Sequence, residues 1–403
     1  GTSSTGAAWV GTFTGTASGT SHIELTSPGN GAVGNGAFVI GAGGVTLDIS
    51  GNGVEWNNNT IITQGNALTN SGNFRIIGTG VNSITGGGAV TNTASGDIDF
   101  EDGILTLSSD LINNGNIDIE TASGKTLNGG SNIVNANGAT INQTDGGSLT
   151  LDGGSDIVGQ SGSTLNLTDG SLILTDGNLT SAGLTNVIDV SYSISGAGTV
   201  TNEAGGTLDL TPDASTGRTL TINNTGGIIN NGLTNYLGNA NITLTGTGSF
   251  TNNADFDHRG GGNDNLVLNG SLVFTNSATG TYDFLAAGDI QILGMARFNN
   301  SGLLIKTGGG TGGGPTSGIF SGFSPTLGSD GSFHNLAGGT VQSDVGTIHI
   351  ASTGGNTSVA GATWTAIGGI IQLGSGWEGT FTGSSAGGGL IKIGNTSNAA
   401  FDD

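Results

Sequence analysis

The side chains best placed to do chemistry lie in the stretch DFDHRGGGNDN, which holds Asp255, Asp257, His258, Arg259 and Asp264. Asp255 and Asp257 are two residues apart, so on a strand their carboxylates point the same way, as a Ca²⁺ site or a glycoside-cleaving pair requires. The tail GGGNDNL matches one unit of the nonapeptide Ca²⁺-binding repeat, but successive copies are missing. The pattern gives Asp255, Asp257 and Asp264 as Ca²⁺ candidates, with a polar corner loop as the simpler interpretation.

Four Asp-Gly pairs form a second candidate for Ca²⁺ binding. They begin at Asp145, Asp152, Asp169 and Asp176. Asp-Gly is good turn chemistry, so these residues are expected at corners of the fold. Aspartates stacked at such corners would also be able to hold Ca²⁺, which is the only cofactor that the sequence suggests.

Other patterns of catalysis are missing from the sequence. The histidines, at 22, 258, 334 and 349, are too dispersed for a zinc site of ordinary ligand spacing. The chain has no Gly-x-Ser-x-Gly elbow, no phosphate-binding Gly-Lys-Ser/Thr and no His-Glu-x-x-His. We therefore expect a protein that is not an enzyme.

The charge balance limits the possible partners. The formal net charge is −22, with 29 acidic residues against 7 Lys plus Arg. So few cations disfavour binding to nucleic acid or to an anionic membrane surface. No apolar run approaches the length of a membrane span, so direct insertion is not expected. The chain has neither an initiator Met nor a signal peptide, which suggests a processed chain or an excised piece.

The elements that must position these residues are short strands. Glycine accounts for 82 of the 403 residues, and apolar residues alternate with polar ones in runs such as NIDIE, SLTLDG and DIQILG. No cysteine is present, so a disulfide framework is excluded. The fold class predicted is all-β.

A repeat of 22–24 residues organises the strands. A motif of the form apolar–x–Asn, followed by small residues and an alternating apolar run, places asparagines at Asn70, Asn92, Asn114, Asn135, Asn202, Asn224, Asn252, Asn276, Asn300 and Asn335. Phe250, Phe274 and Phe298 keep the same period. Such a period is typical of one coil of a parallel β-solenoid, in which equal residues stack into ladders about 4.8 Å apart. We predict one continuous solenoid over residues 1–403, with ladders of these asparagines and phenylalanines.

Two segments and the two ends depart from the repeat. Residues 27–38 and 307–331 break the period and are predicted to be loop excursions. WVGTFTG, with Trp9 and Phe13, is answered 368 residues later by WEGTFTG, with Trp377 and Phe381. That separation is a whole number of coils of about 23 residues. Residues 369–403 are therefore interpreted either as the start of a further copy of residues 1–35, with these aromatics at an end-to-end joint, or as a sister coil of one domain.

The phrases FNNSG, LINNG and GGTLDL resemble those of bacterial β-helical surface proteins. These include filamentous-haemagglutinin-type adhesins, autotransporter passenger regions and giant repetitive extracellular proteins. The resemblance covers roughly residues 60–350 and implies secretion, a location outside the cell or on its surface, and a structural or adhesive role. It carries no functional residues with it, because the shared motif is architectural.

Three functions follow, in order of preference. The first is a non-enzymatic extracellular structural protein, part of a long fibre, stalk or matrix that assembles with itself end to end. The second is an adhesin or glycan-binding passenger domain, with contacts in 307–331 or near Asp255–Asp264. The third is a polysaccharide-processing enzyme, which would require paired carboxylates converging on one face of the solenoid.

Overall fold

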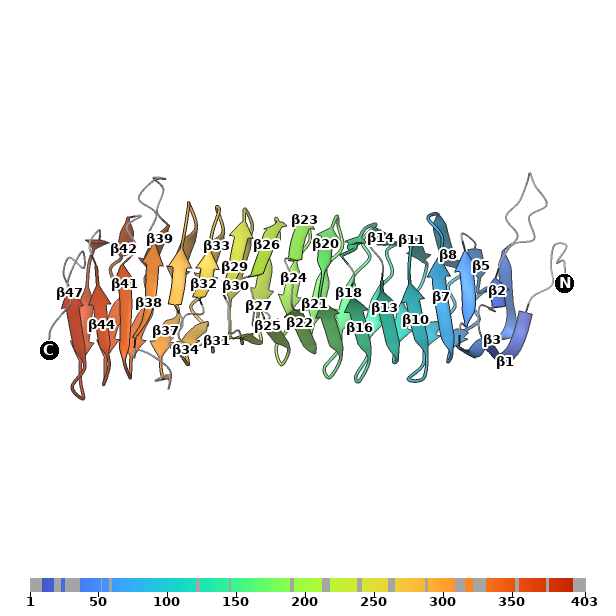
Figure 1. The fold of residues 1–403 in the computed structure, drawn as a ribbon, viewed down its shortest axis with the longest axis horizontal. Coiled ribbons are helices and arrows are strands. Elements are labelled where there is room, and N and C mark those ends of the chain that lie inside the picture. The colour runs from blue at the N-terminus through green and yellow to red at the C-terminus, as the bar shows by residue number, and fades with distance from the viewer. Residues whose placement is uncertain are drawn as a thin grey trace. The chain divides into compact units, whose positions relative to one another are not determined.

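All described elements of the chain are β-strands. The computed structural model describes residues 9–17, 23–25, 37–51, 53–57, 60–120, 124–144, 146–188, 192–211, 218–237, 241–259, 265–286, 289–308, 316–321, 331–351, 355–374 and 377–393. Within these ranges there is no helix, and so none long and apolar enough to cross a membrane. The strands pair in parallel with strands about one turn away, which confirms the predicted parallel β-solenoid (Figure 1).

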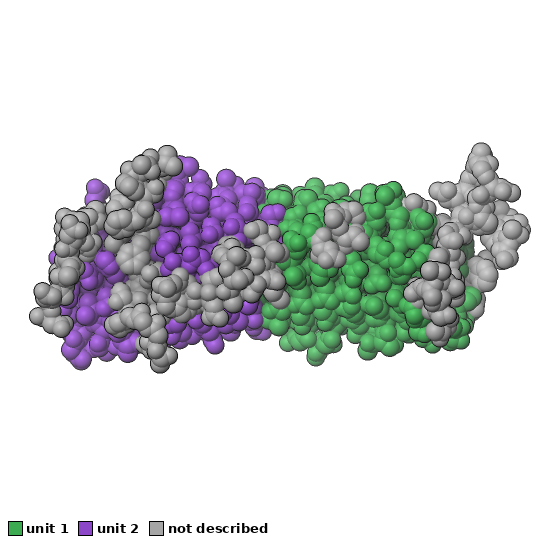
Figure 2. Space-filling view, viewed as in Figure 1, with its two compact units in different colours: residues 1–186, 194–199 green, residues 187–193, 200–403 purple. Residues whose placement is uncertain are grey.

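The strands divide into two compact units (Figure 2). In unit 1, residues 1–186 and 194–199, each turn has three faces. The first face holds β6 (Leu68–Asn70), β9 (Val90–Asn92), β12 (Leu111–Asn113), β15 (Ile133–Asn135), β18 (Ile157–Gly159) and β21 (Leu179–Ser181). The second holds β2 (Ile23–Leu25), β4 (Val54–Asn57), β7 (Asn73–Ile77), β10 (Asp97–Phe100), β13 (Asn116–Ile119), β16 (Thr140–Gln143) and β19 (Thr164–Leu167). The third holds β5 (Thr60–Ile62), β8 (Val81–Thr85), β11 (Gly103–Leu107), β14 (Lys125–Asn128), β17 (Ser148–Leu151) and β20 (Gly170–Leu174).

Unit 2, residues 187–193 and 200–403, repeats the three faces. Its first face holds β24 (Val200–Asn202), β27 (Ile228–Asn230), β30 (Ser249–Asn252), β33 (Val273–Asn276), β36 (Arg297–Asn300), β39 (Ser332–Asn335), β42 (Asn356–Ser358) and β45 (Trp377–Gly379). The second holds β25 (Thr207–Thr211), β28 (Leu233–Tyr236), β31 (Asp255–His258), β34 (Thr281–Phe284), β37 (Leu303–Lys306), β40 (Thr340–Ser343), β43 (Thr363–Ala366) and β46 (Thr382–Ser385). The third holds β26 (Arg218–Asn224), β29 (Ile242–Gly246), β32 (Asn265–Leu268), β35 (Asp289–Ile292), β38 (Thr316–Ser321), β41 (Thr347–Ala351), β44 (Ile370–Leu373) and β47 (Leu390–Ile393).

Four strands do not fit this division. β1 (Trp9–Ala17) and β3 (Phe38–Gly51), both in unit 1, are long and run from the third face onto the first. β22 (Leu184–Ile188) and β23 (Tyr192–Gly196) each contain residues of both units.

Alternation along each strand separates core from surface. In β10, Ile98 and Phe100 are buried inside the turn, whereas Asp97 and Asp99 lie on the outer side. The parallel register then stacks like on like, for example Ile98 opposite Ile117 of β13. Because successive side chains of a strand point to opposite faces, the alternating pattern read from the sequence fixes which residues form the core.

Glycine allows the chain to turn between faces. Gly103 has φ of 80° and stands where a Cβ would collide with the backbone oxygen of Gly78 in the previous turn. Gly170 has φ of 104°, with Gly147 in the same relation to it. Both the left-handed conformation and the close approach of neighbouring turns require glycine at such corners.

A buried asparagine ladder runs along the first face of each unit. In unit 1 the Nδ2 of each asparagine donates to the Oδ1 of the next, over 2.7–2.8 Å, through Asn70, Asn92, Asn113 and Asn135. In unit 2 the same bonds, over 2.7–2.9 Å, join Asn202, Asn230, Asn252, Asn276, Asn300 and Asn335. None of these side chains is more than 4% exposed. An amide offers donors and an acceptor, so it can satisfy the turns on both sides at once.

Two of the predicted ladder positions are wrong. Asn114 lies half-buried on the outer side of its turn, where its Nδ2 donates to the backbone oxygen of Asn92 over 3.2 Å, and Asn113 occupies the ladder instead. Asn224 ends a strand of the third face and donates to the backbone oxygen of Gly227, while Asn230 is the ladder residue of that turn. The regular 22-residue step fails at Asn224 because Asn202 and Asn230 are 28 residues apart.

The core of unit 2 contains a column of stacked phenylalanines. Phe274 stacks on Phe250 at a ring-centroid distance of 5.0 Å and on Phe298 at 4.8 Å, and Phe298 stacks in turn on Phe333 at 5.6 Å. All four rings are 0% exposed. The predicted period at Phe250, Phe274 and Phe298 therefore corresponds to a real stack, which extends one turn further than the sequence suggested.

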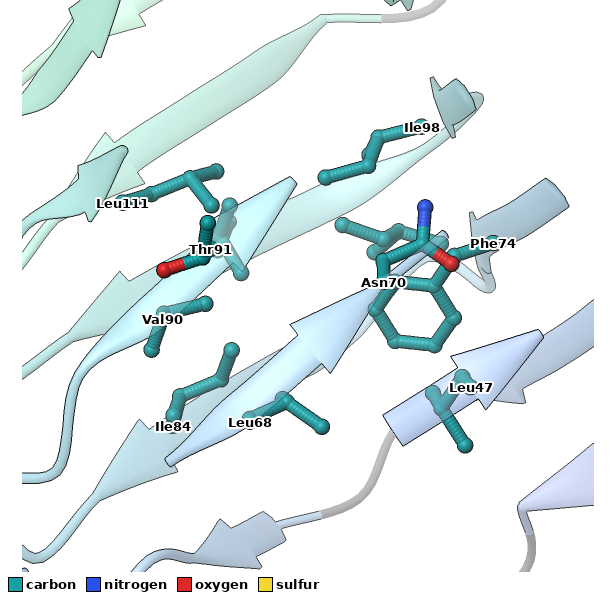
Figure 3. Close-up of a pocket in the computed structure, with 11 residues that line it drawn as sticks. Leu47, Leu68, Asn70, Phe74, Ile84, Val90, Thr91, Ile98 and Leu111 are labelled. Carbon is teal, nitrogen blue, oxygen red and sulfur yellow. The ribbon is translucent and has the colours of Figure 1, made fainter. Parts of the chain in front are cut away.

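The core of unit 1 is mostly aliphatic. A cavity of about 20 Å³ lies there, and Leu68, Ile84, Val90, Ile98 and Leu111 are among its lining residues (Figure 3). That volume corresponds to roughly one water molecule. The cavity is therefore a packing defect and is too small to be a ligand site.

Thr234 allows a direct test of what a buried hydroxyl in the core costs in stability. It is 0% exposed, and its Oγ1 has no hydrogen-bond partner among the residues that the structure describes. We expect Thr234→Val to raise the free energy of unfolding by about 1 kcal/mol, because it removes a buried unpaired hydroxyl at little change in volume. Urea unfolding measures the effect, with the outward-facing Thr243 changed to valine as the control. If Thr234→Val loses stability and the control does not, the Thr234 hydroxyl is not buried without a partner.

The predicted loop excursions are only partly tested. Residues 316–321, in the middle of the predicted 307–331 loop, form β38, which pairs with β35 and β41, so the loop prediction is wrong there. Residues 309–315 and 322–330 lie outside the described residues, as do 27–36 of the other excursion, and β3 begins at Phe38.

The two similar ends take different positions within their turns. Trp9 pairs with Ile40 on the third face, whereas Trp377 pairs with Asn356 on the first. Gly11 and Gly379, which follow them, both have positive φ, of 108° and 117°. The shared phrase therefore makes the same kind of corner at two different corners of the solenoid, and the two ends are not in phase as the 368-residue separation had predicted.

Candidate functional site

Two of the three predicted Ca²⁺ residues, Asp255 and Asp257, are on β31, and among the described residues they belong to no group of three possible metal ligands. Asp255 and Asp257 share the outer side of the strand, as the sequence predicted. Arg259 Nη2 forms an ion pair with Asp257 Oδ2 at 2.6 Å. Asp264 lies outside the described residues. His258 points inward and is 0% exposed, with Nδ1 at 2.8 Å from the hydroxyl of Tyr282.

The Asp-Gly corners act as turns in the described chain. Asp176 Oδ1 accepts a hydrogen bond of 2.9 Å from the backbone nitrogen of Gly154, one turn away. Asp145 lies outside the described residues. No group of three acidic or histidine residues at these corners comes close enough to share a metal ion, within the part of the chain that the structure describes.

Three other carboxylates converge on the outer side of the second face of unit 1. Asp97 and Asp99 come from β10, and Asp118 comes from β13, where it stands opposite Asp99. One carboxylate oxygen of each lies within 4.8 Å of the others. All three side chains are half-buried. We call these residues the acidic cluster.

Amide side chains hold the acidic cluster in place. Asn116 Nδ2 donates to Asp97 Oδ1 over 3.0 Å and to Asp118 Oδ2 over 2.7 Å. Asn142 Nδ2 donates to Asp118 Oδ1 over 2.7 Å, and Asn166 Nδ2 donates to Asn142 Oδ1, also over 2.7 Å. These asparagines form a second, outer ladder, in which Asn116 and Asn142 donate to the carboxylates and Asn166 donates to Asn142.

The neighbouring charges are mostly negative. Arg75 lies opposite Asp99 in β7 and pairs with Glu55 and with Glu101, the latter over 2.6 Å between Nη2 and Oε1. Burial and, in decreasing order of influence, the charges of Asp97, Glu120, Asp118 and Glu101 together raise the pKa of Asp99 to about 7. Burial also raises the pKa of Asp97, against the hydrogen bond from Asn116.

The acidic cluster has two chemical capabilities. Three carboxylates at this separation offer oxygen ligands of the kind that Ca²⁺ prefers. A carboxyl group with a pKa near neutrality beside other carboxyl groups also has the character of a general acid. A shallow surface groove adjoins the cluster and is lined in part by Ser95, Asp97, Asn116, Thr140 and Asn142, so the carboxylate of Asp97 borders it.

The sequence contained a signal for this site that the period obscured. DIDF and NIDI are alternating strands, so their acidic residues must point outward. Their pairing requires Asp97 to stand opposite Asn116, only 19 residues later, which is shorter than the 22–24-residue period. Sequence reasoning therefore found the strands and missed the contact between them.

Removing the charge of Asp99 is expected to stabilise the protein at neutral and higher pH. Because its folded pKa, about 7, is above the ordinary 3.8, the folded state binds the extra proton, and stability falls as pH rises between these values. Asp99→Asn should gain about 1–2 kcal/mol above pH 7, after allowance for solvent screening, and almost nothing below pH 3.8. Thermal unfolding across this range measures it, with the exposed Asp48→Asn as the control.

The same experiment with Ca²⁺ separates repulsion from ligation. If the acidic cluster holds a cation, Ca²⁺ should raise the melting temperature of the unchanged chain more than that of Asp99→Asn. An Asp99→Asn gain that is equal at low and high pH would show that repulsion at Asp99 is not its cause.

No family model, curated protein or solved structure matches this chain. Its function must therefore be argued from the geometry of its own residues.

Proposed function

We propose that the chain is a non-enzymatic extracellular structural protein, which forms or belongs to a long fibre, stalk or matrix on a bacterial cell surface. The observation that carries the proposal is the unbroken ladder of unit 2, in which six successive turns are joined by buried amide bonds from Asn202 to Asn335. Each turn is also paired along its backbone with its neighbours. Separating one turn from the next must break the amide bond and the backbone pairing between those two turns together, which suits a mechanical role.

Composition supports a place outside the cell. Only 7 Lys plus Arg occur in 403 residues, so sites for trypsin-like proteases are few. The chain has no cysteine to oxidise. The high negative charge also makes molecules repel one another side to side, which favours contact through their ends.

The last described turn of unit 2 supports association with a second copy. Trp377 and Phe381 are half-buried and pack on Trp364 at centroid distances of 5.3 and 5.8 Å. Leu390 and Ile393 are 46% and 68% exposed, whereas Leu373, which pairs with Ile393, is 0% exposed. Unpaired strand edges with apolar residues attract another strand. We assign these residues to an end-to-end joint between copies.

Electron microscopy over a dilution series tests this function. We expect filaments at high concentration, which disappear in Ile393→Lys because a charge enters the joint. Met295→Lys is the matched control, because Met295 is equally exposed, at 66%, on an interior turn. Separate particles at every concentration would refute self-assembly, and equal loss in both variants would refute the assigned surface.

The acidic cluster favours a second candidate function, the processing of a polysaccharide. The requirement stated from sequence, carboxylates converging on one face, is met by Asp97, Asp99 and Asp118 beside an open groove. Release of reducing ends from neutral polysaccharides, abolished in Asp99→Asn and in Asp118→Asn, would support it. Binding of a polysaccharide without turnover would instead favour the adhesin. If neither binding nor turnover is found, only the structural role remains supported.

A further inference from the structure

Asparagine followed by glycine is the dipeptide most prone to spontaneous deamidation. The glycine nitrogen attacks Cγ of the asparagine, a succinimide ring forms, and the side-chain nitrogen leaves as ammonia. Water then opens the ring to aspartate or isoaspartate, so the sum is one amide plus water giving one carboxylic acid plus ammonia. The reaction needs a glycine N–H that is free to lose its proton and to approach the side chain.

Two of these pairs are secured by the buried ladder. In Asn114–Gly115 the glycine N–H donates to Oδ1 of Asn113 over 3.2 Å. In Asn231–Gly232 it donates to Oδ1 of Asn230 over 3.3 Å. In both, the ladder residue precedes the vulnerable asparagine, which explains a use for the doubled asparagine in LINNG and IINNG. Its amide oxygen holds the nucleophile away from the neighbouring side chain.

A different bond occurs at Asn269–Gly270. Here the glycine N–H donates over 2.7 Å to Oδ1 of Asn269 itself, the oxygen bonded to the carbon that would be attacked. Gly270 has φ of 70° in the turn between β32 and β33, and Asn269 is half-buried. The nucleophile therefore already faces its target, and within the described ranges it forms no bond to a neighbouring turn that would have to break.

The other described pairs are restrained by adjacent turns. Gly138, after Asn137, donates its N–H to the oxygen of Gly162 over 3.0 Å. Asn128 is the last residue of β14, and its Oδ1 is packed against Gly153. The remaining Asn-Gly pairs, which begin at residues 30, 35 and 52, have asparagines outside the described residues.

We infer that Asn269 is the deamidation site of the described chain, and that Asn113 and Asn230 protect Asn114 and Asn231 from the same reaction. The product places an acid, or an isoaspartate with one extra backbone carbon, at the turn between β32 and β33. Spontaneous ageing of the described chain would therefore begin at this turn.

Peptide mass spectrometry of the full chain, incubated in mildly alkaline buffer, tests the inference. In the native state Asn269 should convert faster than Asn114 and Asn231 by about tenfold or more, because those two react only after local opening. In urea the three rates should converge, because all three then have the same glycine neighbour. Equal rates in the native state would overturn the inference.

A variant tests the protection itself. Asn113→Ala removes the acceptor for Gly115 and should speed conversion of Asn114 by about tenfold, while Asn231 in the same molecules stays slow. Asn231 is thus an internal control for general loss of stability. If both accelerate equally, or if Asn114 remains slow, the ladder is not what protects it.

Discussion

Asn113→Ala is expected to lower the free energy of unfolding by about 3–4 kcal/mol, whereas Asn114→Ala should change it by less than about 1 kcal/mol. The two asparagines are neighbours in sequence, but Asn113 is 0% exposed. Its Nδ2 donates to Oδ1 of Asn135 and to the backbone oxygens of Gly115 and Thr140, over 2.8–3.2 Å. Alanine would leave those buried acceptors without a donor.

Equilibrium urea unfolding measures both variants, and Asn114→Ala is the matched control. Asn114 makes one side-chain bond, to the backbone oxygen of Asn92, from a half-buried position. A larger cost for Asn114→Ala than for Asn113→Ala would mean that Asn114 points inward after all. Equal small costs would mean that the ladder contributes little to stability.

Phe274→Ala is the second change with a large expected effect, about 3–5 kcal/mol of lost unfolding free energy. The ring lies between Phe250 and Phe298, with interplanar angles of 3° and 13°. Phe256 and Tyr282 meet it edge-on at centroid distances of 5.6 and 5.9 Å. Alanine would leave a cavity in the middle of the stack and remove four ring contacts.

Phe274→Leu separates the volume of the ring from its aromatic contacts. Leucine fills much of the space, so its cost should be well below that of alanine, about 1–2 kcal/mol. Calorimetric unfolding of the two variants gives the comparison. If leucine costs as much as alanine, stacking rather than filled volume dominates. If neither variant is destabilised, the column is not part of the cooperative core.

Much of the architecture could be predicted because it depends on short-range patterns. Alternation in DIDF and NIDI fixed the strands and their inner residues, and glycines such as Gly103 fixed corners. The repeating phenylalanines required stacked turns, because identical residues at a constant period come together only in a parallel solenoid. The ladder was predicted at eight of its ten positions for the same reason.

One of the two wrong ladder predictions arose where a shift of one residue moves a side chain from the core to the surface. In INN at 112–114 either asparagine satisfies the motif, yet a shift of one residue turns the side chain from the core to the surface. Asn224 failed because its turn is longer than the period. The acidic cluster was not predicted because its turn is shorter than the period, with Asp97 and Asn116 only 19 residues apart.

The sequence by itself determined the solenoid, its strand faces and the residue types of its ladders, because these follow from local alternation repeated at a nearly constant period. The tertiary structure alone decided which outward-facing residues of neighbouring turns touch. Contacts such as Asp99 with Asp118 depend on the length of every corner between them, and the ends at Trp9 and Trp377 fall on different faces for that reason. Local patterns do not encode the sum of corner lengths, so the acidic cluster could be identified only in the tertiary structure.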